Sequence, residues 1–127
     1  MPIAQAGTLF IPSGTSHDPN RRHIFVVCND TDLNGFNLIV PVTSWTNDLC
    51  DATCRLEAHE HGFLRHSSYV LYRKARIEPA KALEDGLADG TFVADDPVNG
   101  QVFLRVRNGV CRSAQTPRKI KVYFGCP

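Results

Sequence analysis

Basic and hydroxyl side chains stand at the ends of two apolar runs. Arg21, Arg22 and His23 open the first run, and Thr43 and Ser44 close the second. A guanidinium makes two parallel hydrogen bonds to phosphate oxygens and keeps its charge at every working pH, so Arg22 can clamp a phosphate. RNA can be cut without a metal, because its own 2'-hydroxyl attacks the neighbouring phosphate once a base takes the proton and a cation stabilises the developing charge. These side chains therefore suit phosphodiester chemistry.

The same residues also have ordinary structural explanations. An arginine at a strand end is commonly a solvated surface residue, and threonine is frequent in strands because of its β propensity. An imidazole, with an ordinary pKa of about 6.5, can act as a general base or acid, and His23 and His17 both stand near Arg22. A plain surface role for either histidine stays open.

Short apolar runs bounded by turn residues must position these groups. They are too short for helices and predict strands at Thr8–Pro12, His23–Cys28, Phe36–Thr43, Ala52–Glu57, Tyr69–Ile77 and Lys119–Phe124. Asn34-Gly35 supplies the positive-φ positions of a turn between antiparallel strands. The second and third strands should therefore pair, so that one starts where the other ends. The run Tyr69–Ile77 should be the longest strand.

One late amphipathic helix is predicted over Val98–Arg112. Asp96-Pro97 is a suitable helix start, and apolar residues recur every four positions after it. Ala80–Leu83 could add a single helical turn. Several strands with one late helix exclude a doubly wound α/β sheet, whose parallel strands need a helix between nearly every pair. We expect a mainly β protein with α (α+β), a small barrel of antiparallel strands with a helix packed on it.

Composition indicates one cytoplasmic domain covering residues 1–127. The 127 residues contain no apolar run of the roughly 20 needed to span a bilayer, and no signal peptide pattern. Five cysteines is an odd number that argues against a secreted disulfide framework, so we expect reduced thiols. The net charge is only +1, but residues 61–127 carry eleven of the fourteen basic side chains. Any nucleic-acid site must therefore be a local patch.

A zinc site is the one metal centre that the sequence suggests. Cys50, Cys54, His59 and His61 carry suitable ligand atoms. Their Cys-x3-Cys and His-x-His spacings depart from common structural zinc patterns, and no second cysteine pair lies nearby. We therefore expect no metal and no cofactor.

Four segments together resemble the MazF/PemK family of toxin endoribonucleases. They are 21–30, a basic pair and hydrophobic strand ending in Asn-Asp; 38–44, an aliphatic run ending in Pro-x-Thr-Ser; 62–68 with its glycine and serines; and 69–77, an aliphatic strand with an arginine, followed by Leu83. His23 stands where the family usually has proline. The resemblance covers roughly residues 7–83, and the order and spacing of the segments carry it.

The resemblance implies an SH3-like barrel and an enzyme, a sequence-preferring, metal-independent endoribonuclease that cuts single-stranded RNA as the toxin of a type II toxin–antitoxin pair. It assigns catalysis to the family's arginine and threonine, which match Arg22 and Thr43. It also implies a homodimer and a cognate antitoxin whose acidic tail occupies the RNA groove. His23 is a further catalytic candidate that this sequence adds and the family does not supply.

Further residues are candidates for RNA contact: Arg21, His17, Ser44, Trp45 and Arg76. Trp45 could stack on an unpaired base or be a half-buried core residue, and Arg76 could instead support the barrel or a dimer contact. The basic run at Arg118, Lys119 and Lys121 could bind phosphate or form a solvated face. Other functions fit the same barrel: a non-enzymatic SH3-like binding module, a gyrase-poisoning toxin, or a basic patch that binds nucleic acid without cutting it.

Overall fold

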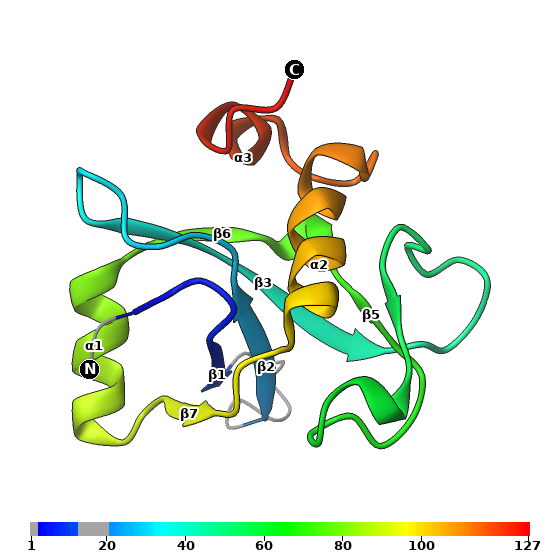
Figure 1. Cartoon of the computed structure of the whole chain (residues 1–127), viewed down its shortest axis with the longest axis horizontal. Coiled ribbons are helices and arrows are strands. Elements are labelled where there is room, and N and C mark those ends of the chain that lie inside the picture. Colours follow the sequence, from blue (N-terminus) through cyan, green and yellow to red (C-terminus); the bar gives the residue numbers. More distant parts are fainter. Residues whose placement is uncertain (1–2, 13–20) are drawn as a thin grey trace.

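The described residues form seven antiparallel strands and three α-helices (Figure 1). A computed structural model describes residues 3–12 and 21–127. The strands are β1 (Thr8–Pro12), β2 (Arg22–Val27), β3 (Phe36–Ser44), β4 (Arg55–Leu56), β5 (Ser68–Val70), β6 (Arg76–Pro79) and β7 (Val93–Asp95). The α-helices are α1 (Ala80–Asp89), α2 (Gly100–Arg112) and α3 (Arg118–Tyr123), with short 3-10 helices η1 (Ala58–Glu60) and η2 (Tyr72–Lys74).

The sheet is organised around the long strand β3. The strand order is β4-β5-β3-β2-β1-β7, and β6 pairs with the first half of β3 while β5 pairs with its last residues. The strands β4 and β7 do not pair among the described residues, so the sheet is open at these two ends. The expected fold class, a mainly β protein of antiparallel strands with added helices, is confirmed, although the described strands form an unclosed sheet and not the expected closed barrel. The predicted pairing of β2 with β3 is also present, and Gly35 has the positive φ of 85° that the turn region needs.

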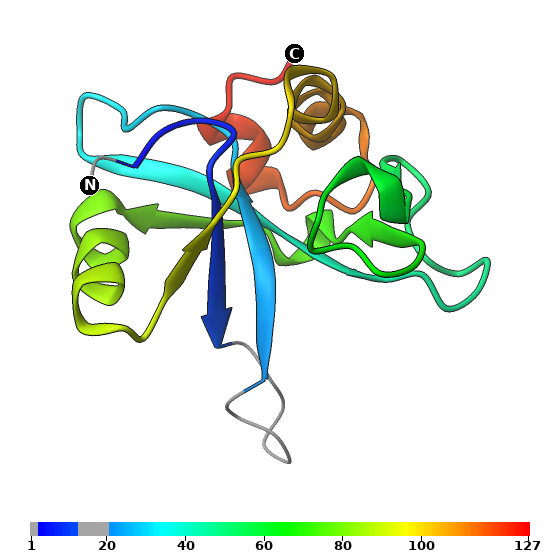
Figure 2. The ribbon, with the colours of Figure 1, turned by 60° about the horizontal axis from the view of Figure 1, so that its bottom comes forward.

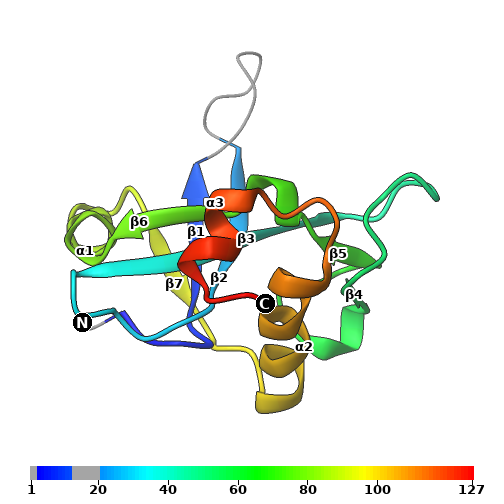
Figure 3. The same ribbon diagram turned by 90° about the horizontal axis from the view of Figure 1, so that it is seen from above.

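Alternating side chains on the strands bury two apolar clusters, one on each face of the sheet. Ile24 and Val26 on β2 contribute to the cluster that α2 covers, whereas Phe25 and Val27 point to the cluster that α1 covers through Leu83. Burying one such side chain contributes about 1.5–3 kcal/mol. Figure 2 and Figure 3 show α1 and α2 on different sides of the sheet. The two clusters fix the register of β2, because a one-residue slip would exchange its faces.

Helix α2 confirms the predicted late helix, although it starts two residues later than expected. Asn99 is its N-cap, and its side chain accepts a hydrogen bond from the Val102 amide at 2.9 Å. Asp96 was the expected cap, but its carbonyl instead accepts a hydrogen bond from the Thr8 hydroxyl at 2.8 Å. Asp96 therefore ties the chain before α2 to β1.

The run Tyr69–Ile77 is not one long strand, which corrects the sequence prediction. It divides into β5, the η2 turn and β6. The cause is Tyr72, whose ring is fully buried and whose hydroxyl donates to the Val106 carbonyl of α2 at 2.7 Å. Because the chain bends there to bury the ring, β5 and β6 pair with different parts of β3.

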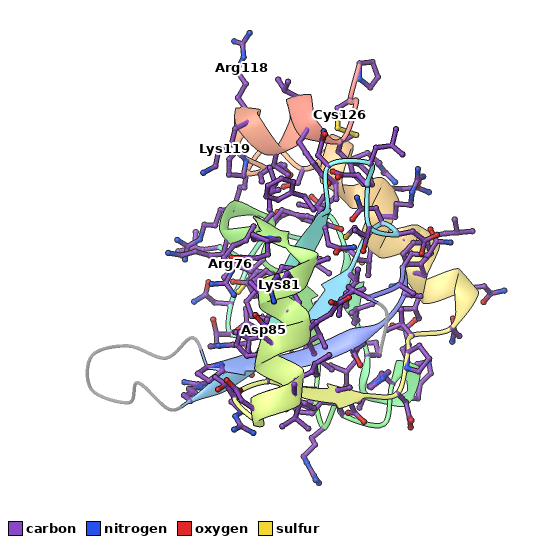
Figure 4. All side chains as sticks on the ribbon, turned by 90° about the vertical axis from the view of Figure 1, so that its left-hand side faces the viewer. Arg76, Lys81, Asp85, Arg118, Lys119 and Cys126 are labelled. Carbon is purple, nitrogen blue, oxygen red and sulfur yellow. A yellow bond between two sulfur atoms is a disulfide. The ribbon has the colours of Figure 1, made fainter. Side chains whose placement is uncertain are left out.

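The C-terminal segment also differs from the prediction. Lys119–Phe124 is not a strand, because residues 118–123 form α3 after Pro117, with Ile120 fully buried. A disulfide joins Cys111 at the end of α2 to Cys126, so the expectation of reduced thiols is wrong for these two cysteines. Figure 4 shows Cys126 close to α3, from which Arg118 and Lys119 point outward.

Smaller differences concern the length of three elements. The single turn expected at Ala80–Leu83 continues as α1 to Asp89, the strand expected at Ala52–Glu57 shrinks to Arg55–Leu56, and β7 was not predicted. All three residues of β7 are exposed at the edge beside β1, so they show no alternation of buried apolar and exposed polar side chains. No described helix combines the length and apolar character needed to cross a membrane.

Candidate functional site

A pocket of about 210 Å³ lies where β2 begins and β3 ends. The segment between η1 and β5 forms its other wall, so residues from three distant parts of the sequence meet there. The lining residues are Arg21, Arg22, His23, Ile24, Val42, Thr43, Ser44, Phe63, Leu64, Arg65, His66 and Ser68.

The charged side chains that line this pocket are basic. Among the described residues, three arginines and two histidines line it, and no carboxylate does. Guanidinium groups that converge on one small cavity create a field that attracts anions and offer several hydrogen-bond donors to phosphate oxygens. The pocket is therefore suited to a phosphate group.

Arg22 and Thr43 line the same pocket, which is the arrangement that the paired strands predict. The register of β2 and β3 pairs Ile24 with Val42. Continuing this register places His23 beside Thr43 and Arg22 beside Ser44. Because successive side chains alternate across a sheet, Arg22 and Ser44 share one face, and His23 and Thr43 share the other. The four groups surround the end of the two strands.

The segment that forms the outer wall is held by His61. The Nδ1 atom of His61 accepts a hydrogen bond from the Phe63 amide at 3.1 Å, so the ring proton is on Nε2, which donates to the Asp96 carbonyl at 2.7 Å. Beyond it, Leu64 is buried in the core, and the Phe63 ring meets Phe10 edge to face at 4.6 Å between centroids. These contacts fix the position of the next residues, Arg65 and His66.

A second set of contacts anchors the same segment to α2. The Glu57 and Glu60 side chains form a reciprocal cap on η1, and Glu60 makes an ion pair with Arg105 of α2. The Ser67 hydroxyl donates to Glu57 Oε2 at 2.6 Å. The outer wall is thus attached at both ends, next to β4 and at the start of β5.

His23 is half-buried at the start of β2. Burial lowers the pKa of its imidazole, and the positive charge of Arg21 lowers it further. The neutral ring, which can accept a proton, is therefore favoured near neutral pH. His17, the other histidine expected near the clamp, lies outside the described residues.

His66 is a pocket residue that the sequence analysis missed. Its Nε2 atom lies 2.6 Å from the Ser44 hydroxyl oxygen, so the two side chains share a hydrogen bond. Arg65 was likewise not singled out. Nothing in the spacing could have identified this pair, because Ser44 and His66 are 22 residues apart and meet only when β5 pairs with the end of β3.

Trp45 lies just beyond the pocket rather than in its lining. The guanidinium of Arg55 sits 4.3 Å from the centre of its ring, and Tyr69 meets it edge to face at 5.8 Å. Half-buried Trp45 and Tyr69, with exposed Arg55, therefore add aromatic surface and a positive charge just after the end of β3.

Arg76 does not join the pocket. It lies on β6, where its guanidinium stacks over the Phe25 ring at 4.8 Å and approaches Glu78 at 3.6 Å. In Figure 4 it lies beside α1, close to Lys81. Arg118 and Lys119 on α3 are also absent from the lining.

The cysteines and histidines considered for zinc do not gather. No three His, Cys, Asp or Glu side chains in the described part of the chain are close enough together to hold a metal ion. Cys54 is buried in the core that α2 covers, and His61 is committed to Asp96 and Phe63.

Comparison with known proteins gives a match in structure and none in sequence. No family model matches the sequence, and no curated protein matches it. Among solved structures, the chain is similar to a chain in the crystal structure of MazE-MazF (Form-III) from Deinococcus radiodurans. The TM-score is 0.56 with 15% sequence identity, and the match covers 100% of both chains. The two chains therefore share a fold over their whole length, an antiparallel sheet with helices packed on it.

Proposed function

We propose that the protein is a metal-independent endoribonuclease that cuts single-stranded RNA with a sequence preference. The observation that carries this proposal is that Arg22 and Thr43 line one small pocket, whose charged lining residues in the described part of the chain are all basic. They are the two residues that the family resemblance assigns to catalysis. A pocket of about 210 Å³ is smaller than the roughly 300–1,000 Å³ of drug-sized sites, and it suits one phosphate with its ribose.

In this proposal Arg22 binds the non-bridging oxygens of the scissile phosphate and stabilises the charge that grows on them. Thr43 donates a further hydrogen bond from its hydroxyl. His23, in its neutral form, takes the proton of the 2'-hydroxyl. The 2'-oxygen then forms a bond to phosphorus while the bond from phosphorus to the 5'-oxygen breaks, which leaves a 2',3'-cyclic phosphate and a 5'-hydroxyl end.

The RNA bases would lie along the cluster beyond the pocket. Unpaired bases stack on aromatic side chains and on guanidinium planes, and such stacking contributes about 1–3 kcal/mol per base. Trp45 and Arg55 offer these two surfaces next to Ser44. Arg21 and Arg65 would contact the neighbouring phosphates. A duplex could not present single bases to this surface, so the substrate is single-stranded.

We further propose that the protein is the toxin of a toxin–antitoxin pair and acts as a homodimer. A solved structure with a similar fold is that of MazE-MazF. A pocket whose described lining carries basic but no acidic side chains would also accept an acidic segment of a protein partner, which would then block RNA binding. The antitoxin in this scheme neutralises the toxin by occupying the pocket.

The test is to incubate the purified protein with a long RNA in EDTA and to analyse the fragments and their ends. We expect cleavage with 2',3'-cyclic phosphate ends, and loss of cleavage in Arg22→Ala with the fold intact. Arg112→Ala is the matched control, because Arg112 is exposed on α2 and does not line the pocket. Salt-sensitive RNA binding without fragments would instead indicate a binding module, and neither binding nor cleavage would favour a gyrase-directed or other non-nuclease role.

A further inference from the structure

Cutting RNA needs two proton transfers, and the proposed site so far supplies one. The 2'-hydroxyl must lose a proton, and the departing 5'-oxygen must gain one, since an alkoxide is a poor leaving group in water. The attacking and leaving oxygens lie on opposite sides of the phosphorus in an in-line displacement. A proton donor is therefore expected on the side of the pocket away from His23.

The described residues place one further imidazole, that of His66, in the pocket lining next to β5. His23 belongs to β2, whereas His66 directly precedes β5, and the end of β3 lies between these strands. His66 and Ser44 share a hydrogen bond of 2.6 Å between Nε2 and the hydroxyl oxygen, and both residues line the pocket. Both partners of this hydrogen bond therefore line the pocket, and a phosphate bound there would lie beside them.

We propose that His66, acting through Ser44, is the proton donor to the leaving 5'-oxygen; this inference rests on the proposed ribonuclease function. In the protonated ring Nε2–H donates to the Ser44 hydroxyl oxygen. As the bond from phosphorus to the 5'-oxygen breaks, the Ser44 hydroxyl gives its proton to that oxygen and takes the Nε2 proton. His23 gains the proton that the 2'-hydroxyl loses, so one turnover leaves His66 neutral and His23 protonated, and exchange with water restores both.

The surroundings agree with this role. Within residues 3–12 and 21–127, the titratable and charged side chains that line the pocket beside His66 are Arg21, Arg22, Arg65 and His23, and no carboxylate is among them. An arginine keeps its proton at every working pH, so the described lining offers His23 and His66 for proton transfer. The outer wall also keeps His66 in place, because His61, Leu64 and Ser67 fix the segment on both sides of it.

The decisive experiment uses an RNA in which sulfur replaces the 5'-oxygen at the cleavage site. A thiolate leaves without protonation, so a variant that lacks the proton donor should cut this substrate as fast as the unsubstituted protein does. We expect His66→Gln to lose at least about 100-fold in single-turnover rate on ordinary RNA, as general acid catalysis predicts, and to recover on the sulfur substrate. Ser44→Ala should behave in the same way, since it removes the relay. His59→Gln is the matched control, because His59 is exposed on η1 and does not line the pocket.

Each outcome separates this inference from the proposed function. If His66→Gln and Ser44→Ala are equally slow on both substrates, or unchanged on ordinary RNA, the proton donor is not His66, although the protein remains a ribonuclease. Arg22→Ala should stay slow on the sulfur substrate, because its role is charge stabilisation. The proposed function itself fails if the unsubstituted protein cuts neither RNA. Thermal unfolding and RNA affinity of each variant exclude a loss of fold or binding as the cause.

Discussion

The hydroxyl of Tyr72 donates to the Val106 carbonyl 2.7 Å away, and the Tyr72 ring lies against the bare backbone of Gly109 one turn later in α2. A Cβ atom on Gly109 would overlap the hydroxyl oxygen of Tyr72. The ring is fully buried and cannot move aside. This contact attaches α2 to the bend between β5 and β6, and so it shapes the strand β5 that carries the outer wall of the pocket.

We therefore predict that Gly109→Ala destabilises the protein, although alanine is the better helix former by about 1 kcal/mol. Overpacking of a closed core costs about 1–3 kcal/mol, and urea unfolding should show a loss in this range. Gly100→Ala in the same helix is the control, because a Cβ there meets nothing within 4 Å. That substitution should be neutral or stabilising. Equal stability of the two variants would contradict the packing argument.

The second prediction concerns the disulfide between Cys111 and Cys126. It closes a loop of 15 residues that contains α3, for which chain entropy predicts a contribution of about 3 kcal/mol. A reductant should lower the unfolding midpoint by a corresponding amount. The double variant Cys111→Ser, Cys126→Ser should have the lower unfolding midpoint already, and the reductant should not change it. α3 should stay docked in that variant, because Tyr123 also donates a hydrogen bond to Asp32 Oδ2 at 2.5 Å.

The third prediction separates the free cysteines by reactivity. The hydrogen bond from Thr46 lowers the pKa of Cys50 to about 7, whereas burial raises the pKa of Cys28 to about 12 and also raises that of Cys54. Because the thiolate is the nucleophile, iodoacetamide at pH 7 should modify Cys50 first. Mass spectrometry of the labelled peptides gives the order. Thr46→Val should move the pH dependence of Cys50 labelling upward; an unchanged dependence would show that Thr46 does not stabilise the thiolate.

Particular residues show why much of the fold was predictable from the sequence. Val26 and Phe25 alternate between two cores, and the Asn34-Gly35 turn joins β2 to β3, so local pattern and turn chemistry predicted this pairing. Lys119–Phe124 was misread because an apolar run of that length fits a strand or a helix equally well. The burial of Ile120 and the nearby disulfide favour the helix α3 over a strand. The break of the predicted strand at Tyr72 could not be predicted from local sequence, because the partner of Tyr72 in α2 is 34 residues away.

The candidate site also contains residues that the sequence could bring together and residues that it could not. The proximity of Arg22 and Thr43 could be predicted, because they stand at the ends of two strands joined by one turn region. His66 could not, since its place opposite Ser44 depends on β5, on the η1 cap and on the hydrogen bonds of His61. Arg76 was a candidate for RNA contact or for support of the barrel, and the bend at Tyr72 puts it on β6, over Phe25. Local pattern finds groups at strand ends, and long-range packing decides which of them meet.

The last prediction uses the pH dependence of His23. Burial and the charge of Arg21 lower its pKa in the folded protein, whereas an unfolded histidine titrates near 6.5. The unfolded state therefore binds more protons as pH falls through the range of about 7 to 5, and the stability that neutral His23 provides is lost there. In urea unfolding, His23→Gln should reduce the loss of stability across this range. NMR titration of the ring should place the midpoint below 6.5, and Arg21→Gln should raise it.

The same titration should appear in RNA cleavage. Since the proposed base must be neutral to accept a proton, the acid limb of the pH–rate profile should follow the midpoint of His23 and move with Arg21→Gln. If His23→Ala retains the parent pH–rate profile, His23 transfers no proton, and the assignment of the base must be abandoned.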